Sequence, residues 1–560
     1  MRAADYVAKF LKQKGVNDIF MLTGYGAMYL NDAIQSAKIN HYSSRNEAAA
    51  PMMASSYSKI SGKIGAVCVT AGPGATNALP GLAEAWVDSS SVMIFSGQVE
   101  KKHTTDFLKI KNLRTYGTAE INIINSVKYL TKFSAVVKSP NQIKYFLEKA
   151  FFYATNGRPG PVWLDIPLDV QRAQINIKKL KSFIPKKIKD KRKSTDVSKV
   201  INLILRSKKL VLICGQGVRQ SKSIQIVKKI IRKLKAPVIF SRLGQDIMSH
   251  DSKYIFGTAG IKGSKFGKKI SRNADLILVF GSRLSVPFIG YNSELFSKKT
   301  KIVMIDIDKS ELKKPLNIHL KINNDLNDFL KKLDLGLKKK LLPNYKKWLE
   351  HCTNLKLSNP MITNDMKKNP IDLYYFMELL GKLSQKKSIL ITDAGSNYYI
   401  GGQVWKFEKG QREITSGSNA AMGLTIPLAI GASVADPKKN IYAVTGDGSL
   451  ELNIQELKTI SHYNLNVKLF VINNGGYVSM LNWQDTIFKG RRIDTKKAAG
   501  HGSLNLKNIA KAFDLKWMKI SRVDEIKSKL SEINRIKGPL FIEVITTNRQ
   551  KIVDSFGYQT

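Results

Sequence analysis

An acidic residue lies between two glycines in the segment IYAVTGDGSLELNIQELKTI, residues 441–460. The apolar run IYAVT is typical of a buried strand, and it ends directly at Gly446, Asp447 and Gly448. Because glycine adopts turn dihedrals and lets a ligand approach the backbone, this strand end suits a binding turn. The segment therefore predicts that the Asp447 carboxylate and the N–H groups around it face a ligand.

A second polar residue is expected at the same place in the fold. After GDGS comes a helical segment, LELNIQELKTISHY, and then the apolar run VKLFVI, which ends at Asn473 and Asn474. The helical segment carries a mostly apolar stripe formed by Leu452, Ile454, Leu457 and Ile460. A strand, a helix and a second strand form a β-α-β unit with a right-handed crossover, so Asp447 and Asn474 should share the carboxyl edge of one parallel sheet.

A carboxylate and an amide oxygen at one sheet edge are suitable ligands for Mg²⁺ or Ca²⁺. Mg²⁺ commonly takes one or two protein carboxylates and completes its shell with phosphate oxygens and water. Gly448, Ser449 and the start of the following helix offer N–H groups and a hydroxyl to an anion. An isolated GDG turn can also be a plain strand-to-helix connection, but its pairing with Asn474 favours a metal-bridged diphosphate site.

The elements that position this site belong to a chain of 560 residues, which is too long for a single hydrophobic core. Apolar runs alternate with amphipathic segments in three blocks, residues 1–170, 195–335 and 370–545. The strand candidates are GAVCVTAG, VMIFSGQ and GPVWLDIP in the first block, KLVLICGQG, APVIFSR, ADLILVFGSR and KIVMIDID in the second, and SILITDAG, NIYAVTGDG, VKLFVINN and PLFIEVIT in the third. This alternation predicts an α/β protein of three doubly wound parallel-sheet domains in series.

The composition carries a large positive charge, with 91 Lys+Arg against 43 Asp+Glu and a formal net charge of +48. Such an excess can mark nucleic-acid binding. The lysines are spread along the whole chain, with clusters such as KKIKDKRK at residues 186–193, and no helix-turn-helix, zinc-finger or RNA-recognition pattern accompanies them. We therefore favour solvated surface lysines that attract anionic small molecules, and keep a nucleic-acid-binding protein on an inactive enzyme scaffold as the alternative.

The cysteines and the distribution of apolar residues indicate the cellular compartment of the protein. Cys68, Cys214 and Cys352 are far apart and show neither metal-ligand spacing nor a disulfide framework. The first residues, MRAADYVAKFLKQKG, lack the apolar core of a signal peptide, and no apolar run approaches the roughly 18 residues needed to span a bilayer. The sequence therefore predicts a cytoplasmic protein that does not interact with membranes.

Together with GDGS and the paired asparagines, three further motifs resemble those of thiamine-diphosphate enzymes and occur in the order of that family. SRNEAAAPMMASSYSKISGKIGAVCVTAGPGATN, residues 43–77, resembles the pyrimidine-domain segment with its catalytic glutamate. GRPGPVWLDIPLDV, residues 157–170, resembles the end of the first domain in acetolactate synthase and its relatives, and SGSNAAMGLTIPLAIGA, residues 416–432, resembles the loop that shapes the bound cofactor. The resemblance covers essentially the whole chain and implies pyrimidine-binding, central and diphosphate-binding domains in that order.

The resemblance implies that thiamine diphosphate and Mg²⁺ are the cofactors. Asp447 and Asn474 would ligate Mg²⁺ together with the backbone carbonyl of Gly476. The diphosphate would be held by Gly446, Gly448 and Ser449 of the GDGS turn and by Gly395, Ser396 and Asn397 of DAGSN.

The resemblance also assigns the pyrimidine end of the cofactor. Met422 would be the apolar wedge that bends the cofactor into a V, and the Ala420 carbonyl would accept a hydrogen bond from the aminopyrimidine. Glu47, in the segment that ends at Asn77, would hydrogen-bond the far ring nitrogen and protonate it. Without the resemblance, Met422 would be interpreted as a core methionine and Glu47 as a solvated helix glutamate. In this family Glu47 and Asp447 of one site come from different subunits, which implies a homodimer or homotetramer.

Several residues resemble the acetolactate synthase branch of the family. Gln98 in SGQVEKKHTTD and Lys132 in LTKFS match active-site positions of that branch. Trp483 falls where those synthases carry a tryptophan that favours larger keto-acid acceptors, although a core aromatic is the other interpretation. The implied enzyme decarboxylates a small-molecule 2-oxo acid, expected to be pyruvate, and adds the two-carbon unit to a second carbonyl.

The residues that depart from this branch would line the part of the site that binds the second substrate, the acceptor carbonyl. Thr118 replaces the phenylalanine of the D-A-F-Q-E segment, while Glu120 is retained. The segment GGYVSMLNWQDTIFKGRRI, residues 475–493, resembles acetolactate-synthase-like proteins linked to surface-polysaccharide sugar pathways. Transfer of the two-carbon unit to a keto-sugar, or simple decarboxylation, therefore stays as the alternative.

Synthases of this branch usually hold FAD in the middle domain. CGQG at residues 214–217, Arg158, and MIDID at residues 304–308 fit such a site. The F-D-D-R element of the branch is replaced by SRLSVP at residues 282–287. We expect a nucleotide-type ligand here, with FAD as the candidate.

Overall fold

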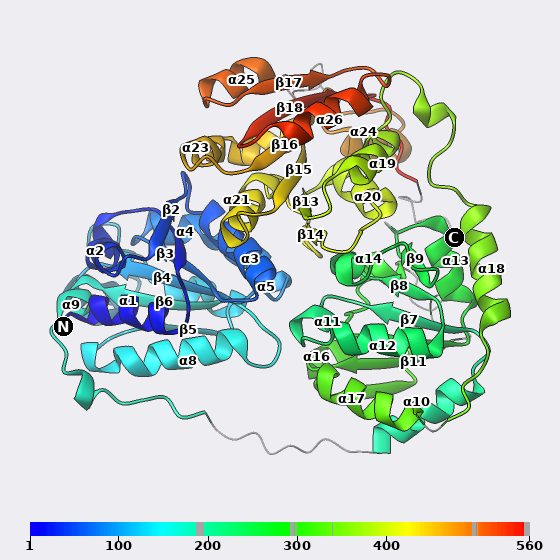
Figure 1. Cartoon of the computed structure of the whole chain (residues 1–560). Coiled ribbons are helices and arrows are strands. Elements are labelled where there is room, and N and C mark those ends of the chain that lie inside the picture. The colour runs from blue at the N-terminus through cyan, green and yellow to red at the C-terminus, as the bar shows by residue number, and fades with distance from the viewer. Residues whose placement is uncertain are drawn as a thin grey trace.

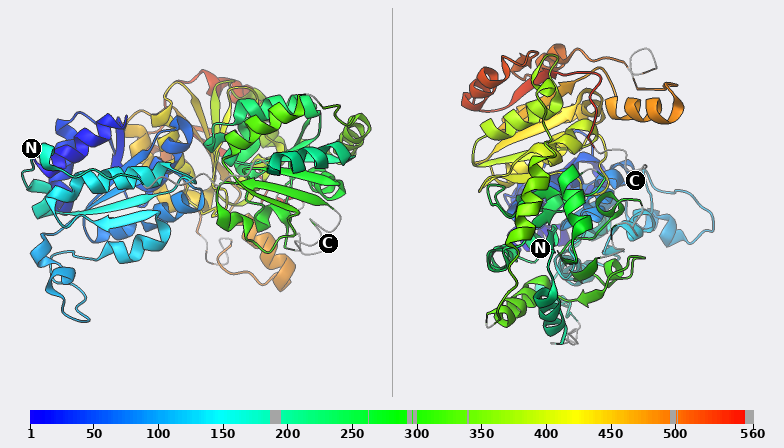
Figure 2. Two further views of the ribbon diagram at one scale, coloured as in Figure 1. Left: turned by 90° about the horizontal axis from the view of Figure 1, so that it is seen from below. Right: turned by 90° about the vertical axis from the view of Figure 1, so that its right-hand side faces the viewer.

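Three parallel six-stranded sheets follow one another along the chain. The computed structural model describes residues 1–185, 195–261, 263–291, 300–338, 340–495 and 502–553, together with Phe296 and Gly500. The lysine cluster at residues 186–193 lies outside the described residues. Figures 1 and 2 show the three sheets at the corners of a triangle, and we call the units built on them the N-terminal, central and C-terminal domains.

The strand order of each sheet is that of an open parallel α/β sheet. The N-terminal sheet has the order β2-β1-β3-β4-β6-β5, with β1 Asp18–Met21, β2 Asn40–Ser43, β3 Gly65–Val69, β4 Val92–Gln98, β5 Phe133–Val136 and β6 Val162–Pro167. The central sheet has the order β12-β11-β10-β7-β8-β9, with β7 Leu210–Cys214, β8 Val238–Phe240, β9 Ile255–Thr258, β10 Leu276–Phe280, β11 Lys301–Asp306 and β12 Leu320–Asn323. The C-terminal sheet has the order β14-β13-β15-β16-β18-β17, with β13 Ser388–Thr392, β14 Arg412–Ile414, β15 Asn440–Gly446, β16 Val467–Asn473, β17 Trp517–Ile520 and β18 Leu540–Ile545.

Helices cover both faces of these sheets, which confirms the doubly wound architecture. The longer helices are α1 Ala3–Gln13, α2 Met28–Ser36, α3 Ala49–Ser61, α5 Leu79–Val87 and α8 Ile143–Thr155 in the N-terminal domain, α10 Thr195–Arg206, α12 Ile224–Leu234, α13 Lys265–Asn273 and α17 Leu326–Leu337 in the central domain, α18 Lys346–Leu357 in the connection, and α19 Leu373–Leu383, α20 Gly395–Val404, α21 Thr425–Ala435, α24 Val478–Phe488 and α26 Ile526–Arg535 in the C-terminal domain. None of the helices within the described residues is both long and apolar enough to cross a bilayer.

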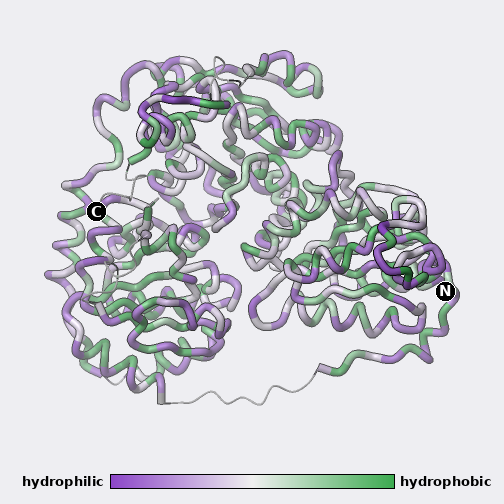
Figure 3. The backbone as a smooth tube through the Cα atoms, turned by 180° about the vertical axis from the view of Figure 1, so that it is seen from behind, coloured by the Kyte–Doolittle hydropathy of each residue, from purple (hydrophilic) through white to green (hydrophobic). Residues whose placement is uncertain are grey.

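The central strands are buried on both faces, as continuous apolar runs predict. Neighbouring residues of β3 illustrate this, because Val67 packs in the core beneath α3 and α5, whereas Cys68 packs in the core beneath α1, α2 and α8. Figure 3 shows the same division, with hydrophobic stretches along the strands and hydrophilic stretches on the outer turns. All three cysteines are buried free thiols, which confirms that the chain has no disulfide framework.

The N-terminal and C-terminal domains share one hydrophobic core. In Figure 1, α3 and α21 lie against each other between the two sheets. Both helices are buried over most of their length, and one continuous cluster includes Met53 of α3 and Leu428 of α21. The Ser56 Oγ atom also donates a hydrogen bond to the Leu428 carbonyl at 2.7 Å. This close contact fixes the position of the cofactor-loop sequence, which directly precedes α21.

Replacing Gly431 by alanine is expected to destabilise this contact by about 1–3 kcal/mol, because overpacking forces neighbouring backbones apart. A Cβ atom at Gly431 would lie only 2.0 Å from the backbone oxygen of Met53. Chemical denaturation monitored by circular dichroism measures the change in the free energy of unfolding. Gly502→Ala is the matched control, because no atom lies within 4 Å of a Cβ there. Equal stability of the two variants would contradict this account of the helix contact.

The helix expected after GDGS is interrupted, which corrects the sequence prediction of one helical segment with a mostly apolar stripe. The chain forms α22 Asp447–Leu450, the short 3₁₀ segment η8 Glu451–Glu456 and α23 Leu457–His462, with non-helical dihedrals at Asn453. Asn453 leaves the helical path because its Nδ2 atom donates to the Gly423 carbonyl at 2.8 Å. Leu452 is consequently 50% exposed rather than part of the core.

Candidate active site

The GDGS turn and the paired asparagines meet at one edge of the C-terminal sheet. Strands β15 and β16 pair in parallel, with Gly446 opposite Ile472, so both end at this edge. The Asp447 Oδ2 atom accepts hydrogen bonds from the N–H groups of Gly475 at 3.0 Å and Gly476 at 3.3 Å. Those glycines adopt φ values of +77° and +133°, which bulkier residues resist. The expected meeting of the two segments is confirmed.

The donor set at this edge fits a hard divalent cation. The Asn474 Oδ1 atom is buried and has no hydrogen-bond partner within the residues that the structure describes. A buried acceptor without a partner calls for an explanation such as an ion, and the Asp447 carboxylate accepts hydrogen bonds from the two glycines that directly follow Asn474. In the described ranges no three His, Cys, Asp or Glu side chains cluster around a common point. A metal here would therefore rely on one carboxylate, one amide, backbone oxygens and the ligand itself, which is the pattern of Mg²⁺ sites.

Asp393 joins the two segments that the sequence assigns to the diphosphate. Its buried carboxylate accepts hydrogen bonds from the Ala394 N–H at 2.7 Å, Asn397 Nδ2 at 3.3 Å, Thr445 Oγ1 at 3.0 Å and Ser449 Oγ at 2.5 Å. Burial raises the pKa of Asp393, and the hydrogen bonds it accepts oppose that rise. The sequence analysis missed this role, although Asp393 opens the DAGSN motif that it singled out.

The hydroxyl of Ser449 is used within the protein. It donates to Asp393 and accepts a hydrogen bond from the Gly423 N–H at 2.8 Å. A hydroxyl has a single hydrogen to donate, so its backbone N–H, in the first turn of α22, is the donor that an anion can use. Ser449 thereby links the GDGS turn to the loop before α21.

Ser449→Ala is expected to lower the free energy of unfolding by roughly 1.5–3 kcal/mol, the range for hydrogen bonds to charged groups. The variant leaves Asp393 with one donor fewer and the Gly423 N–H without its acceptor. Ser461→Ala is the control, because that exposed serine only donates to Lys458 within its own helix. Thermal denaturation of both variants checks the difference, and an unchanged midpoint temperature for Ser449→Ala would contradict the assigned role.

The loop between β14 and α21 contains Ala420 and Met422. Ala420 has φ of +48° and Gly423 has φ of +81°, and the left-handed region is costly for alanine. The Ser416 Oγ atom accepts hydrogen bonds from the N–H groups of Asn419 at 3.1 Å and Ala420 at 2.8 Å. These bonds hold the backbone of Ala420 in its unusual conformation.

Glu47 is buried at the start of α3 and does not lie on a solvated helix face. It is only 8% exposed, and its Oε2 atom accepts a hydrogen bond from Asn77 Nδ2 at 3.1 Å. The preceding backbone is anchored to the C-terminal domain, because the Glu456 Oε1 atom accepts from the N–H groups of Arg45 at 2.7 Å and Asn46 at 3.1 Å. Burial raises the pKa of Glu456. The sequence analysis did not identify Glu456, which lies inside the interrupted helix.

Gln98 is buried at the end of β4 and is fixed by its neighbours. Its Nε2 atom donates to the Ile121 carbonyl at 2.9 Å and to Asp165 Oδ2 at 3.3 Å. Complete burial raises the pKa of Asp165 to about 7. Thr118 is exposed on the nearby loop, whereas Glu120 is buried and accepts from the Thr105 hydroxyl at 2.9 Å.

Lys132 and Trp483 lie on other parts of the molecule. Lys132 Nζ donates to the carbonyls of Asn156 at 2.7 Å and Arg158 at 2.6 Å. Burial and the Arg158 charge lower the pKa of Lys132 to about 8. Lys132 thus bonds to the segment beside the central-domain pocket rather than to Glu47 or Gln98. Trp483 is half-buried on α24, whose side chains Met480 and Ile487 are 52% and 55% exposed.

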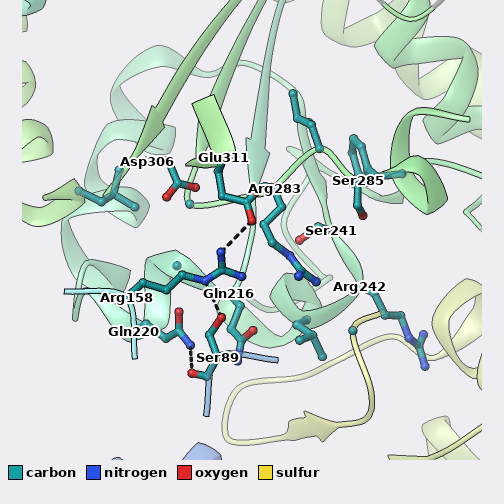
Figure 4. Close-up of a pocket in the computed structure, with 18 of the residues that line it drawn as sticks. Ser89, Arg158, Gln216, Gln220, Ser241, Arg242, Arg283, Ser285, Asp306 and Glu311 are labelled. Carbon is teal, nitrogen blue, oxygen red and sulfur yellow. Dashed lines mark hydrogen bonds and ion pairs between the residues drawn. The ribbon is translucent and has the colours of Figure 1, made fainter. Parts of the chain in front are cut away.

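A pocket lies where the central domain faces the two others (Figure 4). The three sequence elements assigned to a nucleotide contribute to its wall, through Gln216 and Gly217, through Arg158, and through Asp306 and Ile307. The SRLSVP segment, which departs from the family pattern, contributes Ser282 to Ser285. Its empty space is about 1360 Å³, with the open solvent at its mouth included.

Charged groups of both signs line this pocket. Arg158 forms ion pairs with Asp308 at 2.9 Å and Glu311 at 2.8 Å, and its Nε atom donates to Ser89. Burial raises the pKa of Asp306 to about 6. Arg283 Nη2 donates to the Ser418 hydroxyl at 2.5 Å, so one wall of the pocket contacts the loop that carries Ala420.

Comparisons with known proteins cover the same three domains. Residues 1–125 match the family described as thiamine pyrophosphate enzyme, N-terminal TPP binding domain; residues 197–333 match its central domain and residues 393–544 its C-terminal TPP binding domain. The acetolactate synthase large subunit of Lactococcus lactis is 30% identical over 550 residues, which cover 98% of this chain and 93% of that protein. The acetolactate synthase isozyme 2 large subunit of Escherichia coli is 28% identical over 97% of this chain and 95% of its own. The chloroplastic acetolactate synthase of Arabidopsis thaliana is 28% identical over 99% and 82%.

Proposed function

The chain belongs to the thiamine pyrophosphate enzyme family, and from that premise we propose that it is an acetolactate synthase-like carboligase that uses thiamine diphosphate and Mg²⁺. The single observation that carries the proposal is the sheet edge where Asp447 meets the Asn474 Oδ1 atom, which has no hydrogen-bond partner among the described residues. This edge lies inside residues 393–544, which match the C-terminal TPP binding domain. Similarity to acetolactate synthase large subunits over 98% of the chain supports the reaction type.

The proposed reaction joins two 2-oxo acids. Pyruvate loses CO₂, and its two remaining carbons form a carbon–carbon bond with the carbonyl of a second pyruvate, which takes up one proton to give 2-acetolactate. Thiamine diphosphate supplies the acyl-anion chemistry when bound. The protein residues bind the cofactor, orient it, exclude water and move protons.

The diphosphate end would be held at the edge of the C-terminal sheet. Asp447, Asn474 and the Gly476 carbonyl would ligate Mg²⁺, which would offset the negative charge of the diphosphate. The backbone N–H groups of the GDGS turn and of Gly395 to Asn397 would bind the remaining phosphate oxygens. Asp393 supports this assignment, because it already fixes Asn397 and Ser449 relative to each other.

The pyrimidine end would meet Glu47, Ala420 and Met422. Glu47 would hold a proton on the far ring nitrogen, a task that suits a buried carboxyl positioned by a neighbour. Its hydrogen bond from Asn77 supports this role, because that bond fixes the carboxylate plane. The Ala420 carbonyl would accept from the amino group, and Met422 would bend the cofactor. Gln98, the last residue of β4, would contact the substrate.

We further propose that the enzyme acts as a homodimer or homotetramer in which Glu47 and Asp447 of one site come from different subunits. The exposed apolar side chains support this, since Met480, Ile487 and Phe488 of α24 are 52%, 55% and 48% exposed beside the GDGS edge. Exposed apolar patches commonly mark protein interfaces. Two inactive variants, Glu47→Gln and Asp447→Ala, test the arrangement when their subunits are mixed. A shared site predicts restored activity in mixed dimers, whereas a site within one chain predicts none.

The central-domain pocket is proposed to bind a nucleotide-type ligand, with FAD as the candidate. A glycine turn after β7 and an acidic residue at the end of β11 support this, because doubly wound sheets bind nucleotides with such elements. The absorbance and fluorescence of the purified protein, before and after heat release of its ligands, test for flavin. Release of an adenine nucleotide without flavin would exclude FAD and retain the ligand class, and release of neither would contradict the proposal.

The reaction is tested by incubating the full-length protein with pyruvate, thiamine diphosphate and Mg²⁺. We expect 2-acetolactate as the product, and mixed 2-oxo acids followed by mass spectrometry identify the preferred acceptor. Acetaldehyde as the main product would favour a decarboxylase, and a product formed only with a keto-sugar would favour transfer to sugars. The relatives named acetolactate synthase favour the first outcome.

A further inference from the structure

A buried charged cluster of the N-terminal domain contacts the loop that carries Ala420. Lys59 of α3, Glu84 of α5 and Asp88, which follows α5, lie against residues 415–420 of the C-terminal domain. Glu84 is fully buried and Asp88 is 1% exposed. Charged side chains this deeply buried are rarely found without a partner and a purpose.

Asp88 anchors the first part of the loop. Its Oδ1 and Oδ2 atoms accept from the Gly417 N–H at 2.9 and 3.1 Å, and its Oδ2 atom pairs with Lys59 Nζ at 2.6 Å. Lys59 also reaches the Thr415 carbonyl at 3.5 Å. These contacts neutralise one carboxylate and hold the loop at Gly417.

Glu84 acts on Ser416, the residue directly before Gly417. The Ser416 Oγ atom donates to Glu84 Oε2 at 3.2 Å, while it accepts from the N–H groups of Asn419 and Ala420. A serine hydroxyl has one hydrogen and two lone pairs, so all three of its hydrogen-bonding positions are filled. Because Glu84 takes the hydrogen, both lone pairs point at the loop, and the Ala420 N–H is held at 2.8 Å.

Ala420 needs such support. Its φ of +48° lies in the left-handed region, where a residue with a Cβ costs roughly 1–2 kcal/mol and persists only when its surroundings fix it. The hydrogen bond from the Ala420 N–H to Ser416 Oγ acts directly on this residue. Loss of the Glu84 acceptor would free the Ser416 hydroxyl to rotate and would weaken that bond.

We propose that Glu84 and Ser416 are a positioning pair that holds Ala420 in its left-handed conformation and thereby aims its carbonyl at the aminopyrimidine of the cofactor. The inference rests on the proposed function, because it assigns that carbonyl to the cofactor. Neither Glu84 nor Ser416 has to touch the cofactor in this role. The pair also explains why the N-terminal domain contributes a buried acid to a loop of another domain.

The charge state of Glu84 agrees with this arrangement. Burial and the neighbouring Asp88 charge raise the pKa of Glu84, while Lys59 and the Ser416 hydroxyl oppose the rise. Its Oε1 atom is buried and accepts no hydrogen bond in the described part of the chain, and a proton on it would be shared with the neighbouring Asp88, while Oε2 still accepts from Ser416. Glutamine, which is neutral and keeps an acceptor oxygen, should therefore substitute for Glu84.

The test compares Glu84→Ala, Glu84→Gln and Ser416→Ala in the full-length protein. At saturating thiamine diphosphate and Mg²⁺, we expect kcat to fall by roughly 10–100-fold in Glu84→Ala and Ser416→Ala, since a misplacement of about 1 Å can cost 100-fold. The cofactor dissociation constant should change by less than about threefold, because diphosphate binding supplies most of the affinity. Glu84→Gln should stay close to the wild type, and the circular dichroism signal of the bound cofactor should change only in the two alanine variants.

The exposed Glu408→Ala variant is the control for loss of a glutamate. Wild-type kcat and an unchanged cofactor signal in both alanine variants would overturn the proposal. Equal loss of activity and thermal stability in Glu84→Ala and Glu84→Gln would also overturn it, because the acid would then be needed only for folding. Ser416→Ala removes a single oxygen and keeps the test decisive if Glu84→Ala fails to fold. Failure of the proposed function itself is distinguishable, because the wild type would then bind no thiamine diphosphate.

Discussion

Replacing Asp447 by alanine is expected to abolish Mg²⁺-dependent binding of thiamine diphosphate and, with it, turnover. In the proposed site the Asp447 carboxylate would be the only acidic ligand of the metal. It also accepts hydrogen bonds from the N–H groups of Gly475 and Gly476. Loss of an outer-shell partner already costs a metal site roughly 10–100-fold in affinity or activity, so loss of a direct ligand should cost more. Steady-state assays with pyruvate, together with gel filtration and analysis of the retained cofactor, measure both effects.

The loop itself could move when Asp447 is lost, and a second variant separates the two causes. Asn474→Ala leaves the donors Gly475 and Gly476 of Asp447 in place but removes the Asn474 oxygen, which has no partner among the described residues, so it should weaken Mg²⁺ binding without disturbing the turn. Asp436→Ala is the matched control, because that residue pairs with Lys439 at the opposite end of β15. Full activity in Asp447→Ala, with normal cofactor retention, would contradict the metal assignment.

Glu47→Gln is expected to lower kcat by roughly 10²–10⁴-fold, the range for loss of a general acid–base group. Glutamine has nearly the same size and can keep the contact with Asn77, so the fold and cofactor retention should remain. The diphosphate end, which would supply most of the affinity, is not altered. Cofactor binding measured by intrinsic fluorescence, alongside kcat, separates this pattern from unfolding.

Glu100→Gln is the control for Glu47→Gln. Glu100 pairs with Arg172 on the surface of the same domain, so its loss should leave kcat unchanged. If Glu47→Gln turned over pyruvate at the wild-type rate, the proton role of Glu47 would be wrong. If it lost cofactor binding and thermal stability together, Glu47 would be a structural residue.

The sequence predicted the interior of each sheet and missed its edges. The apolar runs singled out in the sequence all form strands, because strands buried on both faces are continuously apolar. The strands β2, β5, β9, β12, β14 and β17 flank the sheets. They are short, and β2 has no buried residue while β12 has a single one, Ile322. The four-residue strand β1 was missed too, since so short a run gives little periodicity.

Within the site, the sequence predicted the residues whose position follows from local order along the chain. Asp447 and Asn474 end neighbouring strands of one β-α-β unit, so their meeting required only the crossover rule. Asp393, Glu84 and Glu456 could not be found in this way, because their partners lie on other elements or in another domain. Glu84 and Ser416 are 332 positions apart in the chain. The packing of the N-terminal domain against the C-terminal domain, through α3 and α21, brings them together.

The interrupted helix after GDGS is a further case in which a contact with another segment decides the structure. The spacing of Leu452, Ile454, Leu457 and Ile460 is compatible with a helix, and Leu457 and Ile460 are indeed buried. The side chain of Asn453 instead binds the Gly423 carbonyl, and this tertiary contact outweighs helix propensity. The residue that breaks the helix is therefore also one that fixes the cofactor loop.

Calorimetric titration of thiamine diphosphate into metal-free, full-length protein tests the central claim most directly. Asp447 and Asn474 are proposed to bind the diphosphate through a divalent ion, so the titration is performed once with Mg²⁺ and once with a chelator. We predict saturable binding of one cofactor per chain with Mg²⁺ and loss of that binding with the chelator. Binding that is equally strong without the metal, or no binding in its presence, would contradict the account.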